Sequence, residues 1–212
     1  MSWPHFLSVS RIIAGPVVAA LVVLRPGNGY LIAAVIFSAA SLTDLVDGKL
    51  ARYSQSVSPL GVFVDTTSDK ILVALTLVGM TVAGLAPLWI VLLILAREYL
   101  ISGLRSFAAS CNRIISAHIW GKGKAAVTML AIGLVLLAAN GRAGGALGSL
   151  ASHSNWDVAY SVSSWILVLA AILTVISGVR YIVDAWPLLR ASAEDASPAD
   201  IRRMVTGSDK AG

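Results

Sequence analysis

The sequence predicts an all-α, polytopic membrane protein with six transmembrane helices and a short N-terminal interfacial segment. Hydrophobic residues make up 57% of the 212 residues and charged residues only 13%, whereas a soluble domain carries about 25% charged residues. A membrane-spanning helix needs about 20 predominantly apolar residues. Stretches without any charged residue lie at positions 12–24, 26–43, 71–96, 125–141 and 158–179, and all but the first approach or exceed this length.

The helices that we expect cover residues 7–24, 29–51, 62–83, 87–110, 123–140 and 160–186. No cluster of basic residues precedes the first helix and Pro16 interrupts it, so it does not resemble a cleaved signal peptide. The long uncharged stretch 71–96 divides at residues 81–87, where glycine and proline predict a turn. Residues 141–155 are expected to form a loop. We expect one membrane domain over residues 1–190 and a polar cytoplasmic tail over residues 191–212.

The placement of basic residues predicts the orientation in the bilayer. On one side, the loops and the tail contain Lys49, Arg52, Arg113, Lys122, Lys124, Arg190, Arg202, Arg203 and Lys210. The opposite loops contain Arg25 and Arg142. Because cytoplasmic loops are enriched in Lys and Arg, we expect a multi-pass protein of the cell membrane with both termini in the cytoplasm. The net charge of +5 follows from this topology, and we expect no nucleic-acid partner.

Four aspartates lie at the ends of two consecutive predicted helices. Asp44 and Asp47 end the second helix, and Asp65 and Asp69 begin the third. Residues three or four apart lie on one face of a helix, so the two pairs can face each other. A charge at membrane depth costs at least about 2.5–3.5 kcal/mol and the carboxylates repel one another, which predicts a bound cation. Oxygen ligands favour magnesium, manganese or calcium over zinc. The alternative is a solvated cluster in which Asp44 pairs with a nearby base.

These aspartates belong to a longer pattern. Residues 44–52 read D-L-V-D-G-K-L-A-R, and after eight residues Gly61, Asp65 and Asp69 follow at spacings of four. The segment resembles the signature of the CDP-alcohol phosphotransferase family, D-x2-D-G-x2-A-R-x8-G-x3-D-x3-D, at every fixed position. The resemblance implies transfer of a substituted phosphate from a CDP-linked donor to an alcohol, with release of CMP, by a protein that forms homodimers.

The resemblance also implies a role for each matched residue. Two ions of magnesium or manganese would be held by Asp44, Asp47 and Asp65, with help from Asp69. Asp69 would also act as the general base. The CDP-lipid would be bound by Gly48, Ala51, Arg52, Ser58 and Gly61. The chemistry requires such groups, because metal ions neutralise a pyrophosphate, a carboxylate can accept the proton of an attacking hydroxyl, and a guanidinium fits a phosphate.

Further segments resemble the bacterial phosphatidylglycerophosphate synthases, one branch of this family. Residues 96–105 read A-R-E-Y-L-I-S-G-L-R and residues 121–124 read G-K-G-K, where those enzymes often have A-R-E-x-x-I-S-x-L-R and G-K-x-K. This resemblance implies CDP-diacylglycerol as donor and glycerol 3-phosphate as acceptor. The phosphate of such an acceptor would require cations, and the candidates are Arg97, Arg105, Lys122, Lys124 and Arg180. Alternatively, these cations bind no ligand and only reflect the enrichment of Lys and Arg on the cytoplasmic side of membrane proteins.

Other functions remain open at this point. Thr66 follows the third aspartate, where the phosphatidylglycerophosphate synthases usually have proline, and residues 65–69 resemble the branches that use inositol phosphate or serine. Inositol phosphate, phosphatidylglycerol and serine are therefore alternative acceptors. From other classes, a small cation transporter would also place carboxylates within the membrane, and a non-catalytic membrane scaffold is a third possibility.

Overall fold

The computed structural model describes residues 3–50, 59–110 and 120–195, and all regular structure in these ranges is helical. The helices are α1 (Trp3–Leu24), α2 (Gly29–Leu50), α3 (Pro59–Val82), α4 (Leu88–Ser110), α5 (Trp120–Arg142) and α6 (His153–Asp195), with a short 3-10 helix at Gly148–Leu150. The predicted all-α fold is confirmed, and each predicted helix overlaps one of these six α-helices. Residues 3–6 form the first turn of α1 and not a separate interfacial segment.

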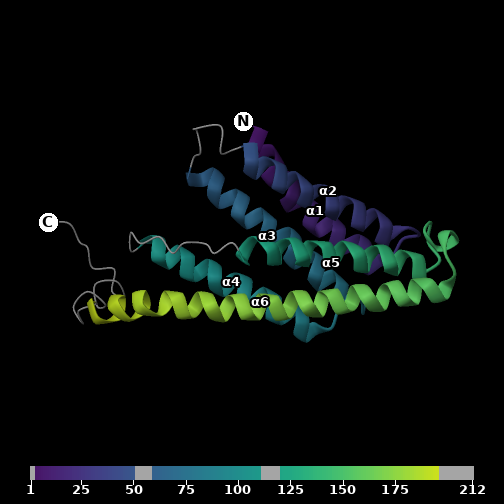
Figure 1. Cartoon of the computed structure of the whole chain (residues 1–212). Coiled ribbons are helices and arrows are strands. Elements are labelled where there is room, and N and C mark those ends of the chain that lie inside the picture. The colour runs from purple at the N-terminus through teal and green to yellow at the C-terminus, as the bar shows by residue number, and fades with distance from the viewer. Residues whose placement is uncertain (1–2, 51–58, 111–119, 196–212) are drawn as a thin grey trace.

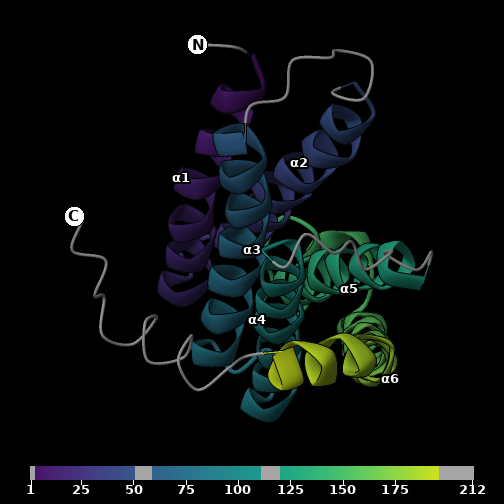
Figure 2. The ribbon, with the colours of Figure 1, turned by 90° about the vertical axis from the view of Figure 1, so that its left-hand side faces the viewer.

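The helices form two groups that meet along α2 and α3 (Figures 1 and 2). In the first group, α1 packs against both α2 and α3; in the second, α6 packs against both α4 and α5. Contacts of α2 with α5 and of α3 with α4 join the two groups. Buried apolar side chains such as Phe37, Leu77, Ile132 and Leu136 fill the space between them.

Glycines allow α1 and α3 to approach closely. A Cβ atom on Gly79 would lie 3.1 Å from the Cα atom of Ala19, and one on Gly15 would lie 3.4 Å from the Cα atom of Leu72. Small residues permit this kind of backbone approach between membrane helices. One turn before Gly15 on α1, Arg11 is buried, with 1% of its surface exposed.

The predicted division of residues 71–96 into two helices is confirmed at Gly84. This glycine has φ +75°, a conformation that residues with a Cβ atom rarely adopt. The N–H of Leu85 donates to the carbonyl of Met80 at 2.8 Å, which satisfies a carbonyl at the end of α3. Pro87 precedes α4, so the chain reverses within a few residues.

The last helix is longer than predicted at both ends. It begins at His153 instead of residue 160, and it continues to Asp195 instead of residue 186. The predicted start of the polar tail at residue 191 therefore lies within α6. At about 1.5 Å per residue, its 43 residues extend over roughly 65 Å, which is about twice the thickness of a bilayer's hydrocarbon core.

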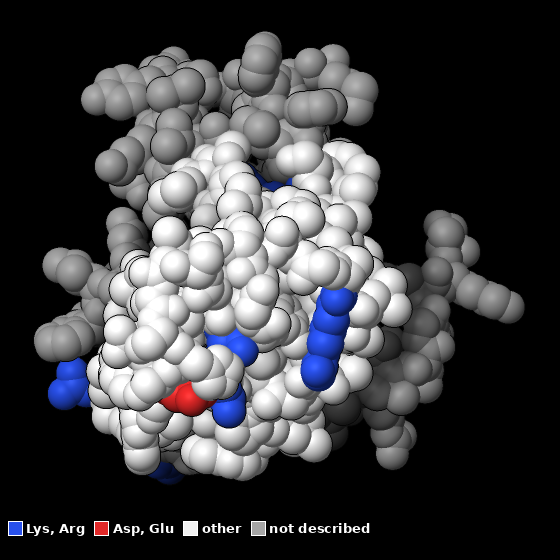
Figure 3. Space-filling model, turned by 90° about the vertical axis from the view of Figure 1, so that its right-hand side faces the viewer, with Lys and Arg blue, Asp and Glu red and all other residues white. Residues whose placement is uncertain are grey.

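The connections between helices are tied together at one end of the molecule. Arg25 donates to the carbonyl of Ala83, so the α1–α2 turn contacts the α3–α4 turn. The Asn28 side chain accepts a hydrogen bond from the N–H of Ala146 at 2.6 Å. The α1–α2 turn therefore also contacts the α5–α6 turn. Figure 3 views the molecule from this side and shows a largely uncharged surface with few charged side chains.

Length and composition support membrane insertion for part of the described chain. The windows Ala125–Arg142 and His153–Trp186 are long and apolar enough to cross a bilayer, and the apolar parts of α1 and α2 are shorter. Large apolar side chains are exposed around the outside, including Leu130 at 59% and Trp165 at 71%. Exposed apolar surface of this extent is typical of contact with lipid, and it agrees with the predicted membrane protein.

Candidate active site

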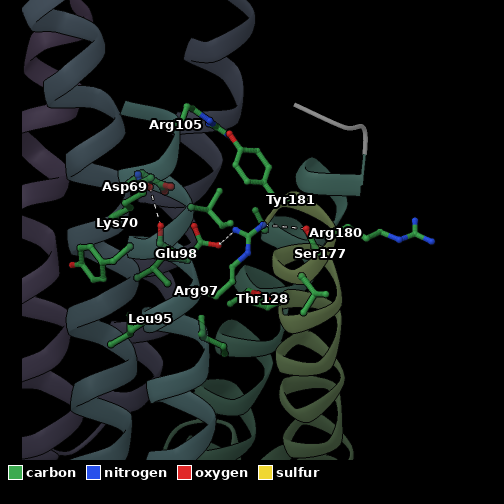
Figure 4. A pocket seen from close by; sticks show the side chains of 18 of the residues that line it. Asp69, Lys70, Leu95, Arg97, Glu98, Arg105, Thr128, Ser177, Arg180 and Tyr181 are labelled. Atoms are coloured by element: carbon green, nitrogen blue, oxygen red, sulfur yellow. Dashed lines mark hydrogen bonds and ion pairs between the residues drawn. The ribbon is translucent and has the colours of Figure 1, made fainter. Parts of the chain in front are cut away.

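A cavity of about 680 Å³ lies between α3, α4, α5 and α6. Its volume is within the usual range for small-molecule sites, about 300–1,000 Å³. Apolar residues of all four helices form part of the wall. The charged residues and the tyrosines of the wall are Asp69, Lys70, Arg97, Glu98, Tyr99, Arg105, Arg180, Tyr181 and Asp184. Figure 4 shows that several of these side chains converge on one region of the cavity.

The aspartates of the signature lie on two helices. Asp44 and Asp47 are in the last two turns of α2, and Asp65 and Asp69 are in the first half of α3. The two helices are in contact. The partly buried side chain of Asp69 lines the cavity, whereas the side chains of the other three lie outside the described part of the structure.

The donor set of the signature fits a hard divalent cation. All four candidate ligands are carboxylates, and they are spaced three and four residues apart on helices that contact each other. Magnesium and manganese prefer oxygen ligands of this kind. Of the predicted CDP-lipid contacts, Gly48 is on α2 and Gly61 is on α3. Ala51, Arg52 and Ser58 lie outside the described residues.

Arg97 is fixed between α4 and α6. Its Nη1 atom is 2.7 Å from Oε1 of Glu98, and its Nη2 atom donates to Oγ of Ser177 at 3.0 Å. The stem of the side chain crosses α6 at Gly178, where an added Cβ atom would lie 2.8 Å from Cγ of Arg97. Because 89% of the side chain is buried (11% exposed), its charge acts in a region with little solvent screening.

The other predicted cations occupy different positions. Arg105 follows Arg97 by two turns on α4, is exposed, and lines the cavity. Arg180 also belongs to the wall, but Figure 4 shows its side chain pointing away from Arg97 and Arg105. Lys122 and Lys124 are near the start of α5, and their side chains lie outside the described part. The structure thus brings Arg97 and Arg105 to one cavity with Asp69.

Most residues of the wall were not among the predicted site residues, and three of them are polar side chains that bear on the chemistry of the site. Lys70 follows Asp69 and lines the cavity. Ser177 and Tyr181 of α6 also line it. A signal for the last two exists in the sequence, because two hydroxyl side chains four residues apart share a face of an otherwise apolar helix. The apolar stretch gave no indication of which face turns towards the charged part of α4.

The fold and the cavity define a helical membrane protein that gathers carboxylates and cations around one internal site. The family model for CDP-alcohol phosphatidyltransferases matches residues 1–176, so the chain belongs to this family, as the signature predicted. Membership makes the protein an enzyme of phosphatidyl transfer and not a transporter or a scaffold.

Curated relatives resemble the chain over most of its length. The CDP-diacylglycerol–glycerol-3-phosphate 3-phosphatidyltransferase of Bacillus subtilis (strain 168) is 33% identical over 77% of this chain and 78% of the relative. The protein of the same name from Rickettsia bellii (strain RML369-C) is 32% identical over 84% and 92%, respectively. A probable phosphatidylglycerophosphate synthase of Mycobacterium tuberculosis (strain H37Rv) is 34% identical over 85% and 80%.

Proposed function

We propose that the protein transfers the phosphatidyl group of CDP-diacylglycerol to glycerol 3-phosphate, giving phosphatidylglycerophosphate and CMP. The observation that carries this proposal is the presence of Asp69, Arg97 and Arg105 on the wall of one cavity. A carboxylate on the same wall as two cations fits an acceptor that carries both a reactive hydroxyl and a phosphate. The names of the relatives support the same donor and acceptor.

In the proposed reaction, a hydroxyl oxygen of glycerol 3-phosphate attacks the phosphorus of the phosphatidyl group. A new P–O bond forms to the acceptor, and the bond from this phosphorus to the oxygen shared with CMP breaks. The electron pair leaves with CMP. The proton of the hydroxyl passes to the carboxylate of Asp69, a step for which a positioned base typically contributes about 10²–10⁴-fold in rate.

Chain residues hold the two substrates. The acceptor's phosphate would be bound by Arg105, Lys122 and Lys124, with further charge from Arg97 and Arg180. The donor would be bound by Gly48, Ala51, Arg52, Ser58 and Gly61. Asp44, Asp47 and Asp65, with Asp69, would hold two ions of magnesium or manganese. When bound, the metal supplies positive charge that neutralises the pyrophosphate and stabilises the leaving phosphate.

The placement of cations supports an active site on the cytoplasmic side of the cell membrane. Lys70, Arg97 and Arg105 gather around the cavity, whereas Arg25 in the α1–α2 turn and Arg142 at the end of α5 lie at the other end of the molecule. By the positive-inside rule, both termini lie in the cytoplasm. We further propose that residues 1–190 form the membrane domain, that residues 191–212 form a tail whose start continues α6, and that the protein functions as a homodimer.

An acceptor screen tests the proposal. Purified protein in mixed micelles with CDP-diacylglycerol is given glycerol 3-phosphate, inositol phosphate, phosphatidylglycerol or serine, each with magnesium or manganese. CMP release and the mass of the lipid product are measured. Release of CMP with glycerol 3-phosphate alone is the expected result, and activity restricted to another acceptor would contradict the acceptor assignment. Absence of CMP release with every acceptor would contradict the proposed reaction as a whole.

A further inference from the structure

Tyr181 of α6 has a buried hydroxyl group in the wall of the cavity. Its Oη atom is shielded from solvent and has no hydrogen-bond partner within the described part of the chain. The buried hydroxyl of a tyrosine usually has a partner, and leaving such a group unsatisfied costs about 1–3 kcal/mol. An unsatisfied hydroxyl on the wall of a ligand-sized cavity therefore indicates a group that is satisfied when a ligand binds.

The surroundings of this hydroxyl restrict the chemistry of the ligand. In Figure 4 the ring of Tyr181 lies between Arg97 and Arg105, and the hydroxyl points towards Arg105. An arginine offers five donors and no acceptor, so it cannot accept the phenolic proton. A ligand that binds here must bring acceptor oxygens and negative charge. A phosphate monoester has both.

The position of Tyr181 is fixed by the contact between α4 and α6. Ser177 lies one turn before Tyr181 on the same face of α6 and accepts the hydrogen bond from Arg97. Gly178 leaves room for the stem of Arg97. The same contact thus orients the guanidinium and the phenol relative to each other, as a preorganised recognition site requires.

We propose that Tyr181 is a specificity-determining residue for the acceptor, and that its hydroxyl donates a hydrogen bond to the acceptor's phosphate beside Arg105. This inference rests on the proposed function. Tyr181 lies beyond residue 176, the last residue that the family model matches. It is on α6, whereas the aspartates proposed to bind the donor and the metal are on α2 and α3, so it can contribute to the choice of acceptor separately from them.

The variant Tyr181→Phe tests the role of the hydroxyl, because it removes Oη and retains the ring. We expect the KM for glycerol 3-phosphate to rise about tenfold or more, the loss typical of a hydrogen bond to a charged group. The kcat and the KM for CDP-diacylglycerol should change less than twofold. The matched control is Tyr160→Phe, which removes a hydroxyl that donates to the carbonyl of Leu85 at 3.2 Å near the other end of α6. The control should keep the wild-type KM for both substrates.

A second measurement makes the test independent of turnover. Glycerol 3-phosphate alone should raise the melting temperature of the wild-type protein and of Tyr160→Phe, and this increase should be smaller in Tyr181→Phe. An unchanged KM and an unchanged thermal shift in Tyr181→Phe would overturn the inference, and so would a loss of kcat without a change in KM. Failure of the wild-type protein to use or bind glycerol 3-phosphate would instead overturn the proposed function, so the two failures are distinguishable.

Discussion

The guanidinium of Arg97 donates a hydrogen bond to Oγ of Ser177 at 3.0 Å, across 80 positions of sequence. This bond connects α4 with α6 at the wall of the cavity. The ion pair with Glu98 at 2.7 Å holds the other side of the same guanidinium. Because both terminal nitrogens are bound, the side chain has little freedom to move. A substitution that disturbs the packing of its stem should therefore disturb the site.

Gly178→Ala should disturb the site through this stem. The added methyl group would lie 2.8 Å from Cγ of Arg97, and the stem cannot easily move because its guanidinium is held on both sides. Overpacking of this kind typically costs about 1–3 kcal/mol. We expect a lower melting temperature in detergent and a higher KM for glycerol 3-phosphate.

Gly103→Ala is the matched control for this prediction. It makes the same substitution on α4, where the new methyl group would meet no atom within 4 Å. Since alanine is favoured over glycine within a helix by about 0.5–1 kcal/mol, the melting temperature should stay the same or rise. Equal destabilisation by both substitutions would show that the contact between Arg97 and Gly178 has no special role.

Asp69→Asn should abolish most of the turnover and leave the fold intact. The amide is nearly isosteric with the carboxylate but cannot accept the acceptor's proton, and loss of a general base lowers rates by about 10²–10⁴-fold. CMP release measures the effect, while binding of CDP-diacylglycerol and metal is followed separately. A variant with wild-type turnover would exclude Asp69 as the base.

Asp157→Asn provides a control for the chemical change itself. This carboxylate lies near the other end of α6, 2.8 Å from Nε of Arg142, and about half of each side chain is exposed. An exposed ion pair contributes only about 0–1 kcal/mol. The control variant should therefore retain turnover and nearly all of its stability.

The sequence predicted the helices well because their signal is local. Long uncharged stretches identify helices in lipid without any knowledge of their neighbours, and Gly84 and Pro87 identify the turn between α3 and α4. The start of α6 was missed because His153, Ser154 and Asn155 are polar. These residues are helical where Trp156 packs over Gly141 and Asp157 pairs with Arg142, and both contacts depend on the folded hairpin of α5 and α6.

The candidate site also has a part that the sequence predicts locally and a part that depends on the packing of helices. The aspartate signature lies within 26 consecutive residues, so fixed spacing reveals it. The pairing of Arg97 with Ser177 depends on how α4 and α6 are rotated about their axes. In lipid this rotation is set by packing against neighbouring helices, and an apolar helix has no simple polar face that would reveal it. For the same reason, Tyr181 was not selected while its neighbour Arg180 was, although the side chain of Arg180 points away from the other cations.

Arg105→Gln should weaken binding of the acceptor and leave binding of the donor unaffected. Arg105 lines the cavity on the side to which the Tyr181 hydroxyl points, and a charge-assisted hydrogen bond to a phosphate is typically worth about 1.5–3 kcal/mol. The KM for glycerol 3-phosphate should rise at least about tenfold, with the KM for CDP-diacylglycerol unchanged. Steady-state kinetics with each substrate varied in turn measures both constants. Arg142→Gln, at the opposite end of the molecule, should change neither, and an equal rise in both constants for Arg105→Gln would contradict a role specific to the acceptor.

Asn28→Ala should lower stability without changing the kinetics, because Asn28 helps to tie the turns together far from the cavity. Its Oδ1 atom accepts a hydrogen bond from the N–H of Ala146 at 2.6 Å, and the truncation leaves that donor without its protein partner. The expected loss is about 0.5–1.5 kcal/mol, seen as a lower melting temperature in detergent. The KM values for both substrates should remain at the wild-type level, since the α1–α2 turn contributes no residue to the wall of the cavity within the described part of the chain. A change in the KM for glycerol 3-phosphate would instead show that the contacts between these turns control the separation of α4 and α6 at the site.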